Sequence, residues 1–162
     1  MSDPDFSTFA LRTRGHACED FTQGRRFEHH WGRTIGRGDA TLFAATAMRF
    51  TPLYFNEEYA RDCGHPGIVV DPLLALCTVV GLSVEDLSEA GGPFLGIGSV
   101  RFLLPVYPDD TLSARSEVVS QRASAKYPGF GIVTWRTEGR NQKDEIVLTL
   151  ERTNLVARRN AS

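Results

Sequence analysis

The sequence predicts an α+β domain in which a long antiparallel sheet wraps around one buried central helix. Residues 72–82 are strongly apolar and have the length of a single buried helix. The chain after residue 93 is almost entirely strand-like, in long stretches separated by short turns. A further strand-like stretch at residues 26–35 precedes the helix, so strands are expected both before and after it.

Length, charge and cysteine usage argue against several classes of protein. With 162 residues, 41% of them apolar, the chain is long enough for one domain with a real core. The net charge of -2 argues against a nucleic-acid partner, and no apolar run approaches the ~20 residues that span a membrane. The N-terminus lacks the pattern of a secretory signal. Cys18, Cys63 and Cys77 are odd in number, so we expect reduced thiols in a cytoplasmic protein.

An arm and a strand are predicted before the first helix. Residues 1–18 are polar and aperiodic, and they are expected to form a flexible N-terminal arm ahead of a single domain at residues 19–160. The aromatic and β-branched residues of 26–35 predict one continuous strand, which Gly36 ends.

Two short helices are predicted next. Asp39 is expected to cap the first helix, because the apolar positions at 42–48 follow a helical period. Pro52 is expected to end that helix, since the residue before a proline avoids the α region. Asn56 is a good N-cap for the second helix, over residues 57–63.

The longest helix begins with a clear N-terminal signal. Asp71 is expected to be its N-cap and Pro72 its first residue. The segment up to Leu82 is apolar nearly all round, which predicts a buried helix with Cys77 in the core rather than acting as a nucleophile. Residues 83–87 are expected to add one more turn.

Four strands are predicted in the second half of the chain. Short turns at residues 127–129 and 141–144 join them, so the sheet is expected to be antiparallel, with one face packed and one wetter. The strands are predicted at residues 94–104, 111–122, 131–139 and 146–158.

Short motifs spread over residues 19–158 resemble those of one family. They are His30-Trp31-Gly32-Arg33-Thr34, Pro52-Leu53-Tyr54, Glu58-Tyr59-Ala60, Val80 to Asp86, Val100-Arg101-Phe102, Asp110-Thr111-Leu112 and Thr137 to Gln142. Together, and in this order, they resemble the MaoC-like hydratases and dehydratases, including the relatives that hydrate mesaconyl-CoA-type thioesters. No single motif is diagnostic, but their shared order predicts the fold.

The resemblance implies the hot-dog fold and a thioester substrate. The family acts on acyl groups linked to CoA or to an acyl-carrier protein, by hydration or dehydration. Its chains pair so that two sheets join and the substrate tunnel lies along the interface. We therefore expect a homodimer or a higher homo-oligomer, with no membrane partner.

The catalytic turn of the family is altered in this chain. In typical hydratases it reads roughly G-D-x-N-P-L-H, and its Asp and His activate a water. Arg49 stands in place of the Asp, Thr51 in place of the Asn and Tyr54 in place of the His. Arginine cannot act as a general base, and tyrosine, with an ordinary pKa of ~10, is a better acid than base.

The start of the long helix is altered as well. The resemblance implies that a backbone N–H at this point polarises the thioester carbonyl. Pro72 has no N–H to donate. The neighbouring amides of Leu73 and Leu74 remain available for that task.

Arg49, Tyr54 and Asp71 are predicted to form a rearranged catalytic site, and each has a structural alternative. Arg49 would bind a carboxylate of a dicarboxylic acyl group, or pair with a local acid such as Asp71 or Glu58. Tyr54 would be a general acid or an orienting hydroxyl, or would fill the space of the missing His. Asp71 would be a base, or only the N-cap of the helix.

Substrate-binding roles are predicted for Thr51, His65, Leu73 and Arg101. His65 lies in the loop before the long helix, where it would supply a replacement base or be solvated. Arg101, with Arg136 and Arg140, would reach the phosphates of a CoA or phosphopantetheine arm. No His, Cys and Asp spacing resembles a metal site, and no cofactor is expected.

Three functions are compatible with these residues. The leading hypothesis is a homo-oligomeric hydro-lyase whose usual Asp/His dyad is absent. The second is a pathway-specific lyase, cyclase, isomerase or thioesterase on the same scaffold, which product analysis would distinguish. The third is a non-catalytic subunit that completes a heteromer with an active homologue.

Overall fold

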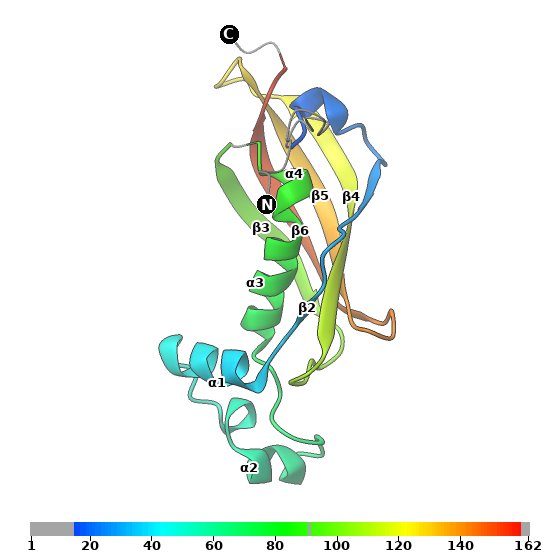
Figure 1. Ribbon diagram of the computed structural model, residues 1–162. Helices are drawn as coiled ribbons and strands as arrows, with labels where there is room; N and C mark the ends of the chain where they lie inside the picture. Colours follow the sequence, from blue (N-terminus) through cyan, green and yellow to red (C-terminus); the bar gives the residue numbers. More distant parts are fainter. Residues whose placement is uncertain (1–14, 91, 160–162) are drawn as a thin grey trace, which may run out of the picture.

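A curved antiparallel sheet with one long helix on its concave side forms the core of the computed structural model, which describes residues 15–90 and 92–159 (Figure 1). Its strands are β1 (Arg26–Glu28), β2 (Arg33–Thr34), β3 (Phe94–Phe102), β4 (Thr111–Ala123), β5 (Phe130–Arg140) and β6 (Ile146–Ala157). They pair in the order β1-β4-β5-β6-β3, and β2 also pairs with β4. The predicted α+β class and the antiparallel sheet are confirmed.

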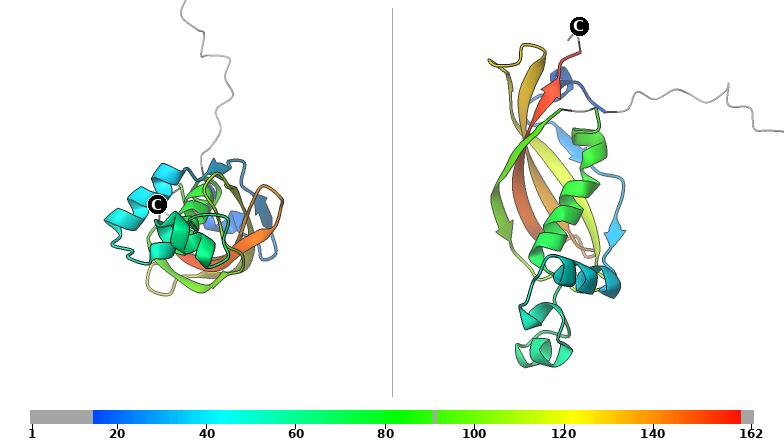
Figure 2. Two further views of the ribbon diagram at one scale, coloured as in Figure 1. Left: turned by 90° about the horizontal axis from the view of Figure 1, so that it is seen from below. Right: turned by 90° about the vertical axis from the view of Figure 1, so that its left-hand side faces the viewer.

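Most of the helices lie between β2 and β3 in the sequence. They are η2 (Cys18–Asp20), which precedes β1, α1 (Arg37–Thr46), η3 (Pro52–Tyr54), α2 (Glu57–Asp62), α3 (Pro72–Leu82) and α4 (Val84–Leu87). α3 runs along the sheet. α1 and α2 lie together beyond one end of the sheet, near the start of α3 (Figures 1 and 2). None of the helices in the described ranges is long and apolar enough to cross a membrane.

The predicted capping signals of α2 and α3 are confirmed. The side chain of Asn56 accepts a hydrogen bond from the Tyr59 backbone N–H at 3.1 Å. The Asp71 side chain accepts one from the Leu73 N–H at 2.8 Å, and Pro72 is the first helical residue. Both helices therefore begin at the residues that the capping side chains predict.

The predicted single strand at residues 26–35 is wrong. Glu28 lies opposite Arg115, whereas Arg33 lies opposite Leu112, so four residues between the two pairs face only two on β4. The extra residues form an irregular segment between β1 and β2. Within it the His29 ring faces inward, where its Nε2 lies 2.8 Å from the buried Ser116 hydroxyl.

Two predicted details of α1 are also wrong. Gly36 is the N-cap, and Asp39 acts from the third helical position, where its carboxylate accepts the Gly36 N–H at 3.1 Å. The helix ends at Thr46, well before Pro52. Its end is set by Met48, which adopts a left-handed conformation with φ 53°.

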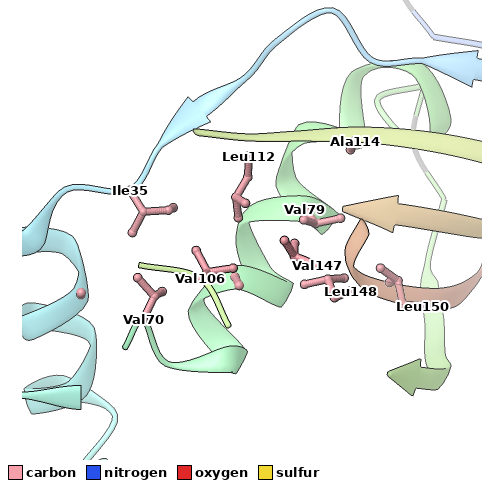
Figure 3. Packing of buried hydrophobic residues seen from close by; sticks show 11 residues of the cluster. Ile35, Val70, Val79, Val106, Leu112, Ala114, Val147, Leu148 and Leu150 are labelled. Atoms are coloured by element: carbon pink, nitrogen blue, oxygen red, sulfur yellow. The ribbon is translucent and has the colours of Figure 1, made fainter. Parts of the chain in front are cut away.

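α3 is buried on one face only, so the predicted burial of the whole helix is wrong. Ala75 and Val79 belong to the main core cluster, together with Leu148 and other residues of the sheet (Figure 3). Cys77, predicted in the core, and Leu73 are exposed. The reason is geometric, since the sheet of one chain covers one side of a helix and leaves its other apolar side open.

Part of the predicted N-terminal arm belongs to the folded domain. Residues 1–14 lie outside the described residues. Cys18, which the prediction placed in the arm, is buried in a second core cluster with Phe21 and Trp135. The His16 ring packs against Phe21, with 5.6 Å between ring centroids. All three cysteines are free thiols.

Candidate functional site

Arg49 is placed by the end of α1. After that helix the Arg49 N–H donates to the Ala44 carbonyl at 2.8 Å, and the Met48 N–H donates to the Ala45 carbonyl. Together with the left-handed Met48, these two bonds form a Schellman motif. A non-glycine residue in this conformation carries strain, which the surrounding structure must support. Arg49 is thereby turned back toward the start of α3.

Asp71 binds Arg49 and caps α3 at the same time. Its Oδ2 accepts the Arg49 Nε–H at 2.6 Å, and its Oδ1 accepts the Leu73 N–H. The Asp71 side chain is 0% exposed, whereas that of Arg49 is 38% exposed. The alternative prediction that Arg49 pairs with Asp71 is confirmed. The Leu73 and Leu74 amides were predicted to remain available to a thioester carbonyl, and this prediction is wrong. The Leu73 N–H donates to the Asp71 side chain, and the Leu74 N–H donates to the Asp71 carbonyl at 2.9 Å.

Tyr54 completes this group from the η3 turn. The Arg49 guanidinium carbon lies 5.8 Å from the centroid of the Tyr54 ring. The hydrogen bond and negative charge of Asp71, and then Tyr54, raise the pKa of Arg49 above its ordinary value. The Thr51 carbonyl accepts the Tyr54 N–H at 3.1 Å, and the Thr51 side chain is exposed. Arg49, Tyr54 and Asp71 are therefore brought together, as predicted.

A cavity of about 320 Å³ lies beside the group formed by Arg49, Tyr54 and Asp71, which we call the Arg49 group. Its walls are apolar and come from η3, the start of α3, β6 and the segment after β3, with Leu53, Ala75 and Phe102 among them. Tyr54 and His65 supply titratable side chains to its lining. An apolar cavity with few polar groups is suited to an acyl chain.

His65 is held against Tyr107. The residue follows Gly64, whose left-handed conformation (φ 87°) ends α2, and its N–H donates to the Ala60 carbonyl at 3.0 Å. The His65 Nδ1 lies 3.0 Å from the Tyr107 hydroxyl. Sequence reasoning missed Tyr107, because the two residues are 42 positions apart and no local pattern marks their contact.

Arg101 lies elsewhere. It lines a hollow on the sheet with Arg136 and Glu151, and this hollow shares no lining residue with the Tyr54 cavity. Arg136 donates to Glu151 at 3.0 Å, and Arg140 donates to Glu138 at 2.8 Å. Arg101 and His65, both predicted to bind substrate, therefore line different hollows.

A buried polar layer lies between the two core clusters. The His29 Nδ1–H donates to Asp86 Oδ2 at 2.6 Å, and the Ser116 hydroxyl, which donates to His29 Nε2, also contacts the Thr137 hydroxyl at 2.8 Å. Burial lowers the pKa of His29 despite the nearby Asp86. This network ties α4 to the sheet. Across residues 15–90 and 92–159, no group of three or more His, Cys, Asp or Glu side chains is arranged to hold a metal.

Comparison with known proteins identifies the family. Residues 6–162 match the sequence model of a family described as mesaconyl-CoA hydratase. The chain belongs to the mesaconyl-CoA hydratase family. The predicted MaoC-like resemblance is confirmed.

Relatives support the same assignment. A mesaconyl-CoA hydratase from Haloarcula hispanica is 36% identical over 91% of this chain and 42% of its own length. A putative MaoC domain protein dehydratase from Chloroflexus aurantiacus is 32% identical, with a TM-score of 0.87 over 94% of this chain and 44% of that one. A Mycobacterium tuberculosis protein described as a double hotdog fold has a TM-score of 0.81 at 24% identity, over 90% of this chain and 45% of that one. The hot-dog prediction is confirmed, and the chain spans less than half the length of these relatives.

Proposed function

We propose that this chain is a hydro-lyase that adds water to, or removes it from, an acyl thioester of CoA or of an acyl-carrier protein. The observation that carries the proposal is the apolar cavity with Tyr54 and His65 in its lining, beside an anchored Arg49. The name of the Haloarcula relative, a mesaconyl-CoA hydratase, supports the same reaction class.

The contacts of Arg49, Tyr54 and Asp71 suit each of these residues to a different role in the reaction. Tyr54 is the general acid, because its phenol group lines the cavity. Arg49 is held through Nε and binds an anionic oxygen of the substrate through its terminal nitrogens. Asp71 positions Arg49 rather than acting as a base, since both its oxygens accept hydrogen bonds and its side chain is fully buried.

Product analysis tests the proposed function. The purified chain is incubated with enoyl and 3-hydroxyacyl thioesters of CoA, including dicarboxylic ones such as mesaconyl-CoA. We expect mass spectrometry to show gain or loss of one water with the thioester intact. Free thiol would identify a thioesterase, and an altered acyl group without a change in water content would identify a lyase, cyclase or isomerase of another kind. No turnover of any thioester would contradict the proposal.

The start of α3 favours a second candidate function. The amides of Leu73 and Leu74 are both occupied at the start of α3, so the helix offers no free donor there to a thioester carbonyl. This favours a non-catalytic subunit that completes a heteromer with an active homologue. Its sign would be poor solubility of the chain alone and rescue by co-expression with that homologue.

We also propose that the chain pairs with a second copy through the β3 edge and the open side of α3. β3 is the last strand of the sheet, and an edge strand offers unpaired backbone groups to another strand. Phe94, Leu95 and Ile97 are exposed on it. A groove of about 800 Å³ along α3 is lined by Leu74, Cys77 and other residues. The double-hotdog relative, of which this chain covers 45%, supports a second unit of the same fold.

A charge on the β3 edge tests this pairing. We expect sedimentation equilibrium to give about twice the 17.9 kDa chain mass for the unaltered protein. Ile97→Arg should shift the mass to that of a monomer, because an unpaired charge is costly in an apolar interface. Tyr127→Arg, in the turn between β4 and β5, is the control and should stay dimeric. A monomeric unaltered protein would contradict the pairing.

A further inference from the structure

The proposed reaction needs a base, and the residues of the catalytic turn do not provide one. Arg49 stays charged, with its pKa raised by Asp71. Asp71 is buried with both oxygens occupied, and Tyr54 serves as the acid. His65 is the other titratable side chain among the described residues that line the cavity. Imidazole is the side chain that most often exchanges protons near neutral pH.

The partner of His65 is itself rigidly held. The Tyr107 N–H donates to Asp110 Oδ2 at 2.8 Å, and Asp110 Oδ1 accepts from the side-chain amide of Gln142 at 2.7 Å. Burial, and then the charge of Asp110, raise the pKa of Tyr107, so its phenol stays neutral. A neutral phenol oxygen accepts an imidazole N–H both before and after the imidazole takes up a proton.

The orientation of the ring follows from this contact. Nδ1 is the nitrogen that faces Tyr107, at 3.0 Å, while the His65 side chain also lines the cavity, so Nε2 is the nitrogen left for the substrate. When Nδ1 carries the proton and donates it to the Tyr107 oxygen, Nε2 keeps a free lone pair. A second residue that fixes the ring in this way is the usual support of a histidine base.

We propose that His65 is the general base of the cavity and that Tyr107 is the positioning residue that holds its Nδ1–H. This inference rests on the proposed hydro-lyase function. In the dehydration direction, His65 Nε2 takes the proton from the α-carbon, and the C–H electron pair becomes the new carbon–carbon double bond. The β-carbon–oxygen bond breaks, and the leaving hydroxyl takes the Tyr54 proton to become water. Proton transfer from the imidazolium to the Tyr54 phenolate restores both groups, and hydration is the reverse.

Conservative substitutions test the base role. His65→Gln keeps the size of the side chain but cannot take up a proton, so we expect kcat to fall by about 100-fold or more. KM and the melting temperature should stay close to those of the unaltered protein. Added imidazole should restore part of the activity of His65→Ala. Tyr107→Phe should lower kcat by about 10-fold without changing KM, because it removes only the orienting contact.

Matched controls separate this role from general damage. His30→Gln replaces an exposed histidine beside Glu85, and Tyr127→Phe replaces a tyrosine in the β4–β5 turn. Both should keep full activity. Turnover that survives His65→Gln would overturn the base role and leave the proposed function standing. Absence of turnover in the unaltered protein would overturn both.

A spectroscopic readout tests the Tyr107 contact without substrate. Nitrogen-15 NMR of the unliganded protein, at a pH where its histidines are neutral, should show the His65 proton on Nδ1. In Tyr107→Phe we expect the proton to shift partly to Nε2. A proton on Nε2 in the unaltered protein, or identical His65 signals in the two proteins, would overturn the positioning role.

Discussion

Replacing Asp71 with alanine is expected to lower both stability and activity. The substitution removes the N-cap of α3 and the bond from Arg49 Nε, and it leaves a space around a fully buried position. We expect a loss of about 2–3 kcal/mol in the free energy of unfolding, which corresponds to about 4–12 °C in melting temperature. We expect kcat/KM to fall by about 10-fold or more, because Arg49 loses its anchor.

Asp71→Asn is the matched control for this prediction. Its side-chain oxygen still accepts the Leu73 N–H, so the cap should be kept while the charge opposite Arg49 is lost. We expect stability between those of the alanine variant and the unaltered protein, and activity close to that of the alanine variant. Urea unfolding and steady-state kinetics on the three proteins measure both effects. Full activity in Asp71→Asn would show that the charge of Asp71 does not position Arg49.

Replacing Arg152 with methionine is expected to stabilise the protein. Arg152 is 2% exposed in the sheet, and within the described part of the chain its Nε and Nη2 have no hydrogen-bond partner. Its guanidinium carbon lies 5.6 Å from the centroid of the Trp135 ring. Burial lowers the pKa of Arg152 to about 10. The charged side chain therefore costs the folded state roughly 3 kcal/mol at every pH below ~10, where it is charged in both states.

Methionine fills similar space without a charge, so we expect Arg152→Met to raise the free energy of unfolding by about 1–3 kcal/mol. Arg152→Lys keeps the charge and loses the planar contact with Trp135, and it should be no more stable than the unaltered protein. Urea unfolding at neutral pH measures both variants. A loss of more than about 1 kcal/mol in Arg152→Met would show that the guanidinium makes a stabilising contact in solution.

Local signals predicted the starts of α2 and α3, where the interacting residues are neighbours in the sequence. Asn56 bonds Tyr59, and Asp71 bonds Leu73, so the starts of α2 and α3 could be predicted from a few residues. Met48 has no such signal, because the left-handed position that ends a helix is usually glycine. The helix end that turns Arg49 toward Asp71 was therefore not predicted.

Contacts between distant segments were harder to predict. The Arg49–Asp71 pair was foreseen only as an alternative, because the resemblance placed both residues at one site. The Tyr107 contact with His65 joins two loops that no motif connects. The exposure of Cys77 depends on what covers the outer side of α3, and the apolar pattern of the helix alone does not report it.

A crystal structure of the chain with a bound 3-hydroxyacyl-CoA tests most directly whether Arg49, Tyr54 and His65 form an active site. We expect the acyl group to lie in the 320 Å³ cavity, with its α-carbon facing His65 Nε2 and its 3-hydroxyl facing Tyr54. We also expect an anionic or carbonyl oxygen of the substrate against the Arg49 guanidinium. An acyl group bound elsewhere, or a cavity that stays closed to it, would contradict the claim that these residues form an active site.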